Sequence, residues 1–281
     1  MSNVCIVCGG RHSEEVYAGI LRCSDCGYIF ADLNLDQKEF ERLYTSDYFN
    51  GEEYSDYVSD ENVLQKNFSA RLDVLMRYVD TSRHQRLLEI GCAYGFFLKQ
   101  ASHKFKEVIG VDVTEEGVNY ARSKFGLNAI RTDLLEWDFD GAPINVACMW
   151  DTIEHLRSPD LYLEKISDQM TSGGLLAVTT GDIDSLVAKV RGRRWRLIHP
   201  PTHAHYFSRR SLERLLNKFG FDVVHAEYCG FSRSIGNIAY NLLVLRWKVP
   251  FLYSLLARTG LLQKTFYTNF FDIVFMIARR R

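Results

Sequence analysis

Short apolar runs alternate with helix-period stretches through the middle of the chain. A stripe of apolar residues at helical spacing covers 60–79 and predicts a helix ahead of the first run. Strands that alternate with helices predict a parallel, doubly wound α/β sheet. We expect strands at 86–90, 107–113, 126–130, 144–150 and 174–180, followed by two last strands at 221–228 and 270–278.

Capping residues mark where several of these helices begin. Thr114 is placed to cap a helix whose first turn is acidic, and Ser158 followed by Pro159 opens another. Ser208 begins a helix that ends at Gly220. Because ligands bind beyond the carboxyl ends of the strands in such sheets, functional residues are expected on the strand-to-helix turns.

Composition limits the function classes. The chain has 281 residues, enough for one large domain with a small one beside it, and its formal net charge is −1. That balance supplies no global field for nucleic acid or a membrane, so nucleic acid is an unexpected partner. Seven cysteines and a start without a secretory signal favour a reducing cytoplasm.

Four cysteines near the amino terminus form two C-x-x-C pairs, each followed by glycine. Cys5 and Cys8 make one pair, and Cys23 and Cys26 make the other. Four thiolates suit a tetrahedral Zn²⁺ ion with every position filled, which predicts a structural site. A redox dithiol or a rubredoxin-like iron is the alternative. The stretch between the pairs is a plausible hairpin, so a zinc ribbon is expected over 1–35.

The segment 36–57 is polar but rich in aromatic residues. Tyr48 and Tyr54 lie in it as candidate substrate-binding residues. A lid over a substrate is one interpretation, and aromatic packing of the ribbon onto the next domain is the other. We group 36–80 as this aromatic segment and the leading helix.

The join "LLEIGCAYGFF" places two glycines where a strand meets a helix. Gly91 and Gly95 let a ligand approach the backbone, and the helix amino terminus favours a carboxylate. Asp112 ends the second strand, where an acid can hold ribose hydroxyls. Asp133 follows the third strand, where an adenine amino group can donate to it. Each feature is weak alone, and their order along the chain strengthens them.

These stretches, with "MWDTIEHLRSP" and "GGLLAVTT", resemble class I S-adenosylmethionine-dependent methyltransferases from about residue 86 to 228. The resemblance implies a Rossmann-like seven-stranded methyltransferase sheet over 81–281, with a helical insertion at 229–269. The cysteine module resembles that of a bacterial subgroup linked to cell-surface polysaccharide and sugar biosynthesis. The cofactors implied are S-adenosylmethionine and structural Zn²⁺.

The resemblance also implies residue roles around the cofactor. Glu89, Gly91 and Gly95 would line its methionine part, and Asp112 would bind the ribose. The other implied contacts are Asp133 and Leu134 flanking the adenine, with Trp150 and Asp151 beside the methyl group.

The stretch "RRWRLIHPPTHAHYF" offers candidates for the acceptor side. His203 or His205 is expected as a general base, because histidine titrates near neutral pH. Trp195 is expected to stack on a sugar face, and Arg194 to pair with phosphate. Structural hydrogen bonding in a Pro-Pro loop is the strongest alternative for the histidines, and a second metal site the weakest. His155 is a further catalytic candidate, with packing favoured.

The insertion contains an apolar and basic tract at 241–262. A packed cap or dimer contact is the first interpretation, and contact with a membrane surface is the second. The function expected overall is O-methylation of a sugar in a nucleotide- or lipid-linked glycan precursor. An RNA methyltransferase guided by the ribbon and a non-catalytic cofactor-binding protein are the alternatives.

Overall fold

The structure is a computed structural model that describes residues 4–33, 39, 61–139 and 143–281. The segment that holds Tyr48 and Tyr54 lies outside the described residues, so both stay predictions. Among the helices that the structure describes, none is long and apolar enough to cross a membrane.

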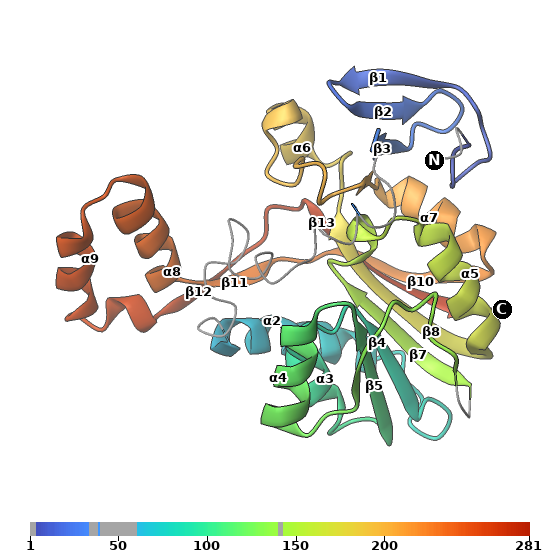
Figure 1. Cartoon of the computed structure of the whole chain (residues 1–281), viewed down its shortest axis with the longest axis horizontal. Helices are drawn as coiled ribbons and strands as arrows, with labels where there is room; N and C mark the ends of the chain where they lie inside the picture. Colours follow the sequence, from blue (N-terminus) through green and yellow to red (C-terminus); the bar gives the residue numbers. More distant parts are fainter. Residues whose placement is uncertain (1–3, 34–38, 40–60, 140–142) are drawn as a thin grey trace.

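A seven-stranded sheet forms the centre of the molecule, as the sequence predicts (Figure 1). Its spatial order is β10-β13-β8-β7-β4-β5-β6. The strands from β6 to β8 are parallel to one another, and β13 lies antiparallel to both β8 and β10. The bounds are β4 Arg86–Ile90, β5 Glu107–Asp112, β6 Ala129–Arg131, β7 Ile144–Trp150, β8 Met170–Gly181, β10 Phe221–Tyr228 and β13 Ile273–Arg280.

Helices cover both faces of the sheet because its strands are apolar on both sides. Successive residues of β4 show this: Leu87 belongs to the core cluster that contains residues of α2 and α3, whereas Leu88 belongs to the one that contains residues of α5 and α7. The bounds are α2 Glu61–Met76, α3 Phe96–Ala101, α4 Glu115–Phe125, α5 Pro159–Gln169, α6 Leu186–Arg191 and α7 Arg209–Lys218.

The predicted helix starts are present, but two of the three predicted caps differ from expectation. Ser158 occupies the N-cap position of α5 ahead of Pro159, but its side chain makes no capping hydrogen bond. Ser208 accepts from the backbone N–H of Ser211 in a capping box. Thr114 occupies the N-cap position of α4, but its hydroxyl donates to Asp112 and caps no backbone group. The Thr114 hydroxyl therefore hydrogen-bonds the carboxylate of Asp112 and not the first turn of the helix.

A second, four-stranded sheet joins the cysteine segment to the stretch with three histidines. Strands β1 Ser13–Tyr17, β2 Ile20–Cys23 and β3 Ile29–Ala31 form an antiparallel meander. The fourth strand, β9 His205–Tyr206, comes from the loop after α6 and pairs with β3. The cysteine ribbon is therefore tied to the main domain by backbone hydrogen bonds.

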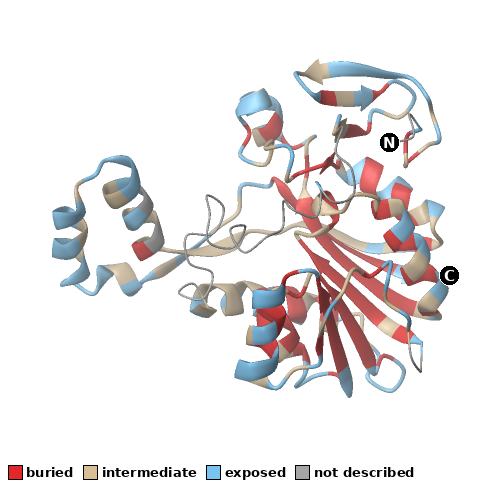
Figure 2. Ribbon diagram, viewed as in Figure 1, coloured by how far each residue is buried: buried red, intermediate tan, exposed pale blue. Residues whose placement is uncertain are grey.

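The segment between β10 and β13 projects from the sheet as an arm (Figure 1). Strands β11 Phe231–Ser234 and β12 Thr265–Thr268 pair as its antiparallel stalk. Beyond the stalk lie α8 Ile235–Ala239, the π-helical turn η4 Tyr240–Arg246, α9 Pro250–Ala257 and the 3₁₀ turn η5 Leu261–Gln263. Most of this arm is exposed or half-buried (Figure 2).

Candidate active site and metal centre

The turn between β4 and α3 is built around two left-handed glycines. Gly91 has φ +74° and Gly95 has φ +75°, a region that L side chains rarely adopt. A Cβ on Gly91 would lie 2.7 Å from the side chain of Thr152, and one on Gly95 would lie 2.8 Å from Ala121. Only glycine therefore fits at both positions of this turn, which lies at the carboxyl edge of the sheet.

Glu89 lies buried within β4, directly before this turn. Its side chain accepts from the backbone N–H of Leu98 in α3, while its Oε2 meets no partner among the described residues. Burial, followed by the charge of Asp112, raises the pKa of Glu89 well above its usual range. A buried carboxyl oxygen without a donor is the group that a polar ligand would satisfy.

Asp112 connects two turns at the end of β5. Its carboxylate accepts from the backbone N–H of Ala93 at 2.8 Å and from the N–H and hydroxyl of Thr114 at 2.8 and 2.6 Å. Burial raises the pKa of Asp112, whereas these donors lower it. Since a carboxylate offers about four acceptor positions, the Asp112 side chain keeps capacity for a ligand hydroxyl.

The carboxylate of Asp133 accepts hydrogen bonds from the hydroxyl of Tyr162 at 2.6 Å and from the backbone N–H of Leu135 at 2.7 Å. Tyr162 lies on α5, so this bond connects the third strand's turn to the helix after β7. Leu134 beside it is 1% exposed and belongs to the core. In this state the side chain of Leu134 faces its core neighbours.

The end of β7 is strained and charged. Asp151 has φ +51°, an unusual value for a residue with a side chain. Its carboxylate accepts from Arg71 of α2 at 2.8 Å and from the hydroxyl of Thr179 at 2.9 Å. The guanidinium of Arg71 also lies over the ring of Trp150, 5.6 Å from its centroid. Arg71 thus fixes both residues at the edge where the methyl group is expected.

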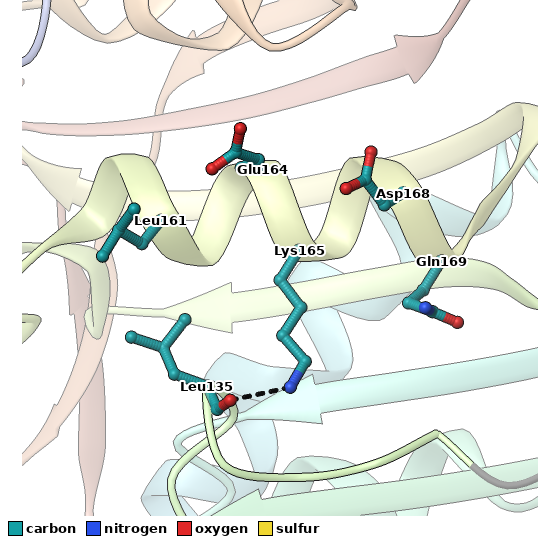
Figure 3. Close-up of a pocket in the computed structure, with 6 residues that line it drawn as sticks. All are labelled: Leu135, Leu161, Glu164, Lys165, Asp168 and Gln169. Atoms are coloured by element: carbon teal, nitrogen blue, oxygen red, sulfur yellow. Dashed lines mark hydrogen bonds between the residues drawn. The ribbon is translucent and has the colours of Figure 1, made fainter.

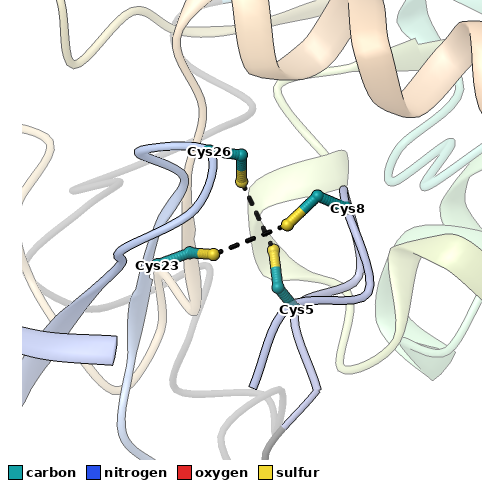
Figure 4. A group of neighbouring side chains, drawn as sticks. All are labelled: Cys5, Cys8, Cys23 and Cys26. Carbon is teal, nitrogen blue, oxygen red and sulfur yellow. Dashed lines mark hydrogen bonds between the residues drawn. The ribbon is translucent and has the colours of Figure 1, made fainter. Parts of the chain in front are cut away.

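The four cysteine sulfurs converge on one point (Figure 4). The Sγ atoms of Cys5 and Cys26 are 3.6 Å apart, as are those of Cys8 and Cys23. Four sulfurs at about 2.3 Å from a tetrahedral zinc would be about 3.8 Å apart, so the cluster fits the ion. In each pair, the N–H of the glycine (Gly9 or Gly27, both with positive φ) donates to the carbonyl of the first cysteine.

His205 is a structural residue here, which corrects the expectation that it acts as a general base. Its Nδ1 hydrogen-bonds the hydroxyl of Tyr28, and its Nε2 lies 2.8 Å from the carbonyl of Leu156. Burial lowers the pKa of His205 to about 4. With both ring nitrogens engaged, neither is available to take a proton from an acceptor.

His203 contacts different neighbours. Its ring packs against His155 and His199, with centroids 4.4 and 3.8 Å away, and its Nδ1 lies 2.9 Å from the carbonyl of Leu197. Burial, followed by the two neighbouring histidines, holds the pKa of His203 far below its usual range. Glu154 and His155 come from the 3₁₀ turn η2 Ile153–His155 and meet His203 there. The cluster brings two imidazoles and one carboxyl group together.

Trp195 is buried, which corrects its expected role as a sugar platform. It is 2% exposed, and its indole N–H donates to Asp272 at 3.0 Å. Arg196 pairs with the same carboxylate at 3.1 Å. Arg194, in the 3₁₀ turn η3 Gly192–Arg194, is exposed and remains accessible to a phosphate.

A shallow pocket of about 350 Å³ lies apart from these residues, along α5 (Figure 3). Lys165 crosses it and donates to the carbonyl of Leu135 at 2.9 Å. The other residues that line it are Leu161, Glu164, Asp168 and Gln169. The lining charges are on the outer surface of the helix, so the pocket carries no functional assignment.

Sequence reasoning missed three residues that organise the site: Arg71, Tyr28 and Glu154. Arg71 lies among the apolar positions of helix α2. An arginine at such a position indicates a buried acidic partner. Glu154 precedes His155 in "DTIEHL", but its nearness to His203 depends on the loop after α6. Tyr28 follows the second cysteine pair and has no local pattern that predicts a buried partner.

The comparisons with known proteins agree with this geometry. A family described as a methyltransferase domain matches residues 62–226. The chain is 24% identical over 173 residues to a ubiquinone biosynthesis O-methyltransferase of Chelativorans, a match that covers 58% of this chain and 65% of that protein. It is 26% identical over 156 residues to (S)-coclaurine N-methyltransferase of Papaver somniferum, covering 52% and 44%. The matches thus span less than two thirds of these relatives' lengths.

Solved structures share the fold. Magnesium protoporphyrin IX methyltransferase from Synechocystis, solved with bound S-adenosylhomocysteine, superposes with a TM-score of 0.56 at 13% identity and covers 88% of this chain and 100% of that one. A methyltransferase from Thermotoga maritima gives 0.54 at 18% identity and covers 86% and 98%. With the family match over more than half of its length, the chain belongs to the methyltransferase-domain family and has the class I S-adenosylmethionine-dependent methyltransferase fold.

Proposed function

We propose that this chain methylates a hydroxyl of a lipid-linked acceptor, namely a sugar of a lipid-linked glycan precursor, with S-adenosylmethionine as donor. The observation that carries the lipid part is the arm, which starts at the carboxyl edge of the sheet. It exposes apolar side chains, and all of its charged residues are basic. The sugar part rests on the resemblance of the cysteine module to that of polysaccharide-pathway methyltransferases. A nucleotide-linked sugar gives the arm no role, so the lipid-linked acceptor is favoured.

The cofactor would be held at the carboxyl ends of β4, β5 and β7. Gly91 and Gly95 let its methionine part approach the backbone, and Glu89 offers a buried oxygen to its amino group. Asp112 takes the ribose hydroxyls and Asp133 the adenine. The sulfonium supplies an already activated methyl group, so the protein's task is to align the acceptor and manage its proton.

The acceptor's proton would leave toward the cluster of Glu154, His155 and His203. The Nδ1 atoms of His155 and His203 face backbone carbonyls at 2.9 Å, so Nδ1 carries the hydrogen and Nε2 the lone pair. His205 takes no part, because both of its nitrogens are engaged.

The root of the arm lies at this same edge. Gly181, the last residue of β8, pairs with Ile273, and Tyr228 at the end of β10 pairs with Val274. The stalk is also fastened to α2, where Asn67 exchanges hydrogen bonds of 2.6 and 3.2 Å with the backbone of Ser232. An acceptor held by the arm would therefore enter beside Asp151 and Arg71.

The chemistry of the arm suits an anionic lipid surface. Residues 229–271 contain no acid and five basic residues: Arg233, Arg246, Lys248, Arg258 and Lys264. Large apolar side chains are exposed between them, with Trp247 at 61% and Phe251 at 68%. Basic residues beside exposed aromatic and aliphatic ones are typical of interfacial membrane contact, whereas the arm of a second copy would offer like charge.

The cysteine cluster is proposed to hold structural Zn²⁺. With all four positions filled by thiolates, the ion would fold the ribbon and take no part in methyl transfer. The ribbon in turn supports β9 and the loop that carries His203.

A polyprenyl phenol is the second candidate acceptor. It is favoured by the names of the bacterial relatives, which act in ubiquinone biosynthesis. Such an acceptor also combines a lipid tail with a hydroxyl, so the same arm would serve it.

Transfer of labelled methyl from S-adenosylmethionine tests the proposal. The pools are lipid-linked saccharides, polyprenyl phenols, nucleotide sugars and total RNA. Label in lipid-linked saccharides supports the proposal. Label in phenols selects the second candidate, and label only in nucleotide sugars or RNA overturns the lipid-linked acceptor.

Vesicle co-sedimentation tests the arm separately. Wild-type protein should sediment with phosphatidylglycerol vesicles and much less with phosphatidylcholine ones, and the double variant Trp247→Ser/Phe251→Ser should lose binding. Leu186→Ser/Val190→Ser is the matched control, since both residues are 78% exposed on α6. Concentration-dependent dimerisation that the arm variant abolishes, without vesicle binding, would contradict the lipid assignment.

A further inference from the structure

Three potential metal ligands from two distant segments meet beside the end of β8. Glu154 and His155 lie on the turn η2, and His203 lies on the loop before β9. One carboxylate oxygen and one nitrogen from each ring all lie within 4.8 Å of one another. Glu154 is 4% exposed and His203 is 4% exposed, so two of the three groups are buried.

Both histidines are already oriented as metal ligands usually are. The Nδ1–H of His155 donates to the carbonyl of Thr202, and that of His203 donates to the carbonyl of Leu197, each at 2.9 Å. A backbone carbonyl on one ring nitrogen fixes the tautomer that presents the other nitrogen as a lone pair. In its neutral form, each ring therefore offers Nε2 as its ligand atom.

The backbone holds the two segments in register. The N–H of Ala204 donates to the carbonyl of Glu154 at 2.9 Å, and the hydroxyl of Tyr206 donates to the carbonyl of His203 at 2.9 Å. Because β9 pairs with β3, the ribbon strengthens the same loop. Ligands fixed by their surroundings before an ion arrives lose little freedom on binding.

We propose that Glu154, His155 and His203 form a second metal site, distinct from the cysteine cluster, for a divalent first-row transition-metal ion such as Zn²⁺. Two imidazoles and a carboxylate match the preferences of such ions, whereas Mg²⁺ and Ca²⁺ prefer oxygen ligands. Three protein ligands leave at least one position open, as in catalytic rather than structural sites. A dication would also compensate the charge of the buried Glu154 carboxylate.

The surroundings suit an open coordination position. A cavity of about 10 Å³, the size of one water molecule, lies beside Glu154 and His203 and reaches Thr180 and Gly181 at the end of β8. A water or an acceptor hydroxyl is the ligand chemistry that fits there. His199 adjoins the site, with its Nδ1 2.7 Å from the hydroxyl of Thr202, and packs on the ring of His203.

Sequence spacing argues against this site because no carboxylate lies close to His203 along the chain. In the folded protein, however, the turn η2 places Glu154 beside the loop that carries His203. The site uses the same cluster to which the proposed function sends the acceptor's proton, and with an ion bound its Nε2 atoms would be ligands and not the base. The ion needs no acceptor to bind, so metal counting tests the site separately from methyl transfer.

Metal counting on the full chain tests the proposal. Protein stripped by mild chelation and re-supplied with Zn²⁺ should hold about two ions per chain by elemental mass spectrometry, and His203→Ala and Glu154→Gln should each hold about one. His103→Ala is the control, because it removes an exposed histidine far from the cluster in sequence. It should keep about two.

Co²⁺ substitution separates this site from the cysteine cluster. The sulfur-to-cobalt absorption of the tetrathiolate site should be unchanged in Glu154→Gln, while the weaker visible absorption of the second ion is lost. Binding of S-adenosylhomocysteine shows that each variant is folded. A wild type that holds about one ion, or folded variants that keep about two, would overturn the proposal whatever the methyl-transfer assay gives.

Discussion

The hydroxyl of Tyr28 hydrogen-bonds Nδ1 of His205 across 177 positions of sequence, and both groups are buried. Tyr28 follows the second cysteine pair, whereas His205 belongs to the loop beside the sheet's carboxyl edge. This contact, with the pairing of β3 and β9, makes the ribbon a support for that loop.

Loss of this contact should cost stability without abolishing chemistry. Tyr28→Phe leaves Nδ1 of His205 buried without its partner, which costs about 1–3 kcal/mol. His205→Gln should retain methyl transfer within about tenfold of wild type, because the residue is structural. Urea unfolding and the labelled-methyl assay measure the two quantities. A His205→Gln protein that still binds S-adenosylhomocysteine but transfers no methyl would restore His205 as the base.

Removal of one cysteine ligand should release the ribbon's metal. Cys8→Ser is expected to lose the structural zinc and to lower the stability of the domain. A loss of about 2 kcal/mol corresponds to a fall in Tm of about 4–8 °C for a domain of this size. Zinc content and thermal unfolding provide the check. Cys229→Ser, outside the cluster, should change neither, and an unaltered zinc content in Cys8→Ser would contradict the assignment.

Gly91 and Gly126 form a matched pair for testing the cofactor turn. Both have positive φ, +74° and +65°, but a Cβ on Gly126 meets nothing within 4 Å, whereas one on Gly91 meets Thr152. Gly126→Ala should cost only backbone strain of about 1 kcal/mol. Gly91→Ala should in addition weaken S-adenosylhomocysteine binding at least tenfold, measured by calorimetry. Equal affinities in the two variants would exclude a role for Gly91 in binding.

The buried Glu89 predicts a pH dependence of stability without cofactor. Because burial raises its folded-state pKa above the unfolded value near 4.5, the native state binds more protons than the unfolded state above that pH. The contribution of Glu89 to stability is thus favourable at low pH and lost as pH rises toward the folded pKa. Glu89→Gln should be more stable than wild type at pH 8 but not at pH 4.5. A difference in Tm that is independent of pH would contradict this, and cofactor binding should weaken in the variant.

Hydrophobic periodicity and local motifs predicted the sheet, its flanking helices and the cysteine cluster. Those features depend on neighbours in sequence: alternating strands and helices define the fold class, and a C-x-x-C turn aims two sulfurs at one point. The seven strands lie where the pattern places them, although β6 is shorter and β8 longer than expected.

Tertiary structure alone decided which polar residues meet. Trp195 and His205 lie in a stretch whose composition is typical of a binding loop. Both are structural residues, because Trp195 is buried against Asp272 and His205 against Tyr28. Glu154 becomes a neighbour of His203, and Arg71 of Asp151, only because separate elements end at one edge of the sheet. A side chain's role follows from the partners that desolvate and orient it. Those partners come from distant parts of the chain, so no local pattern specifies them.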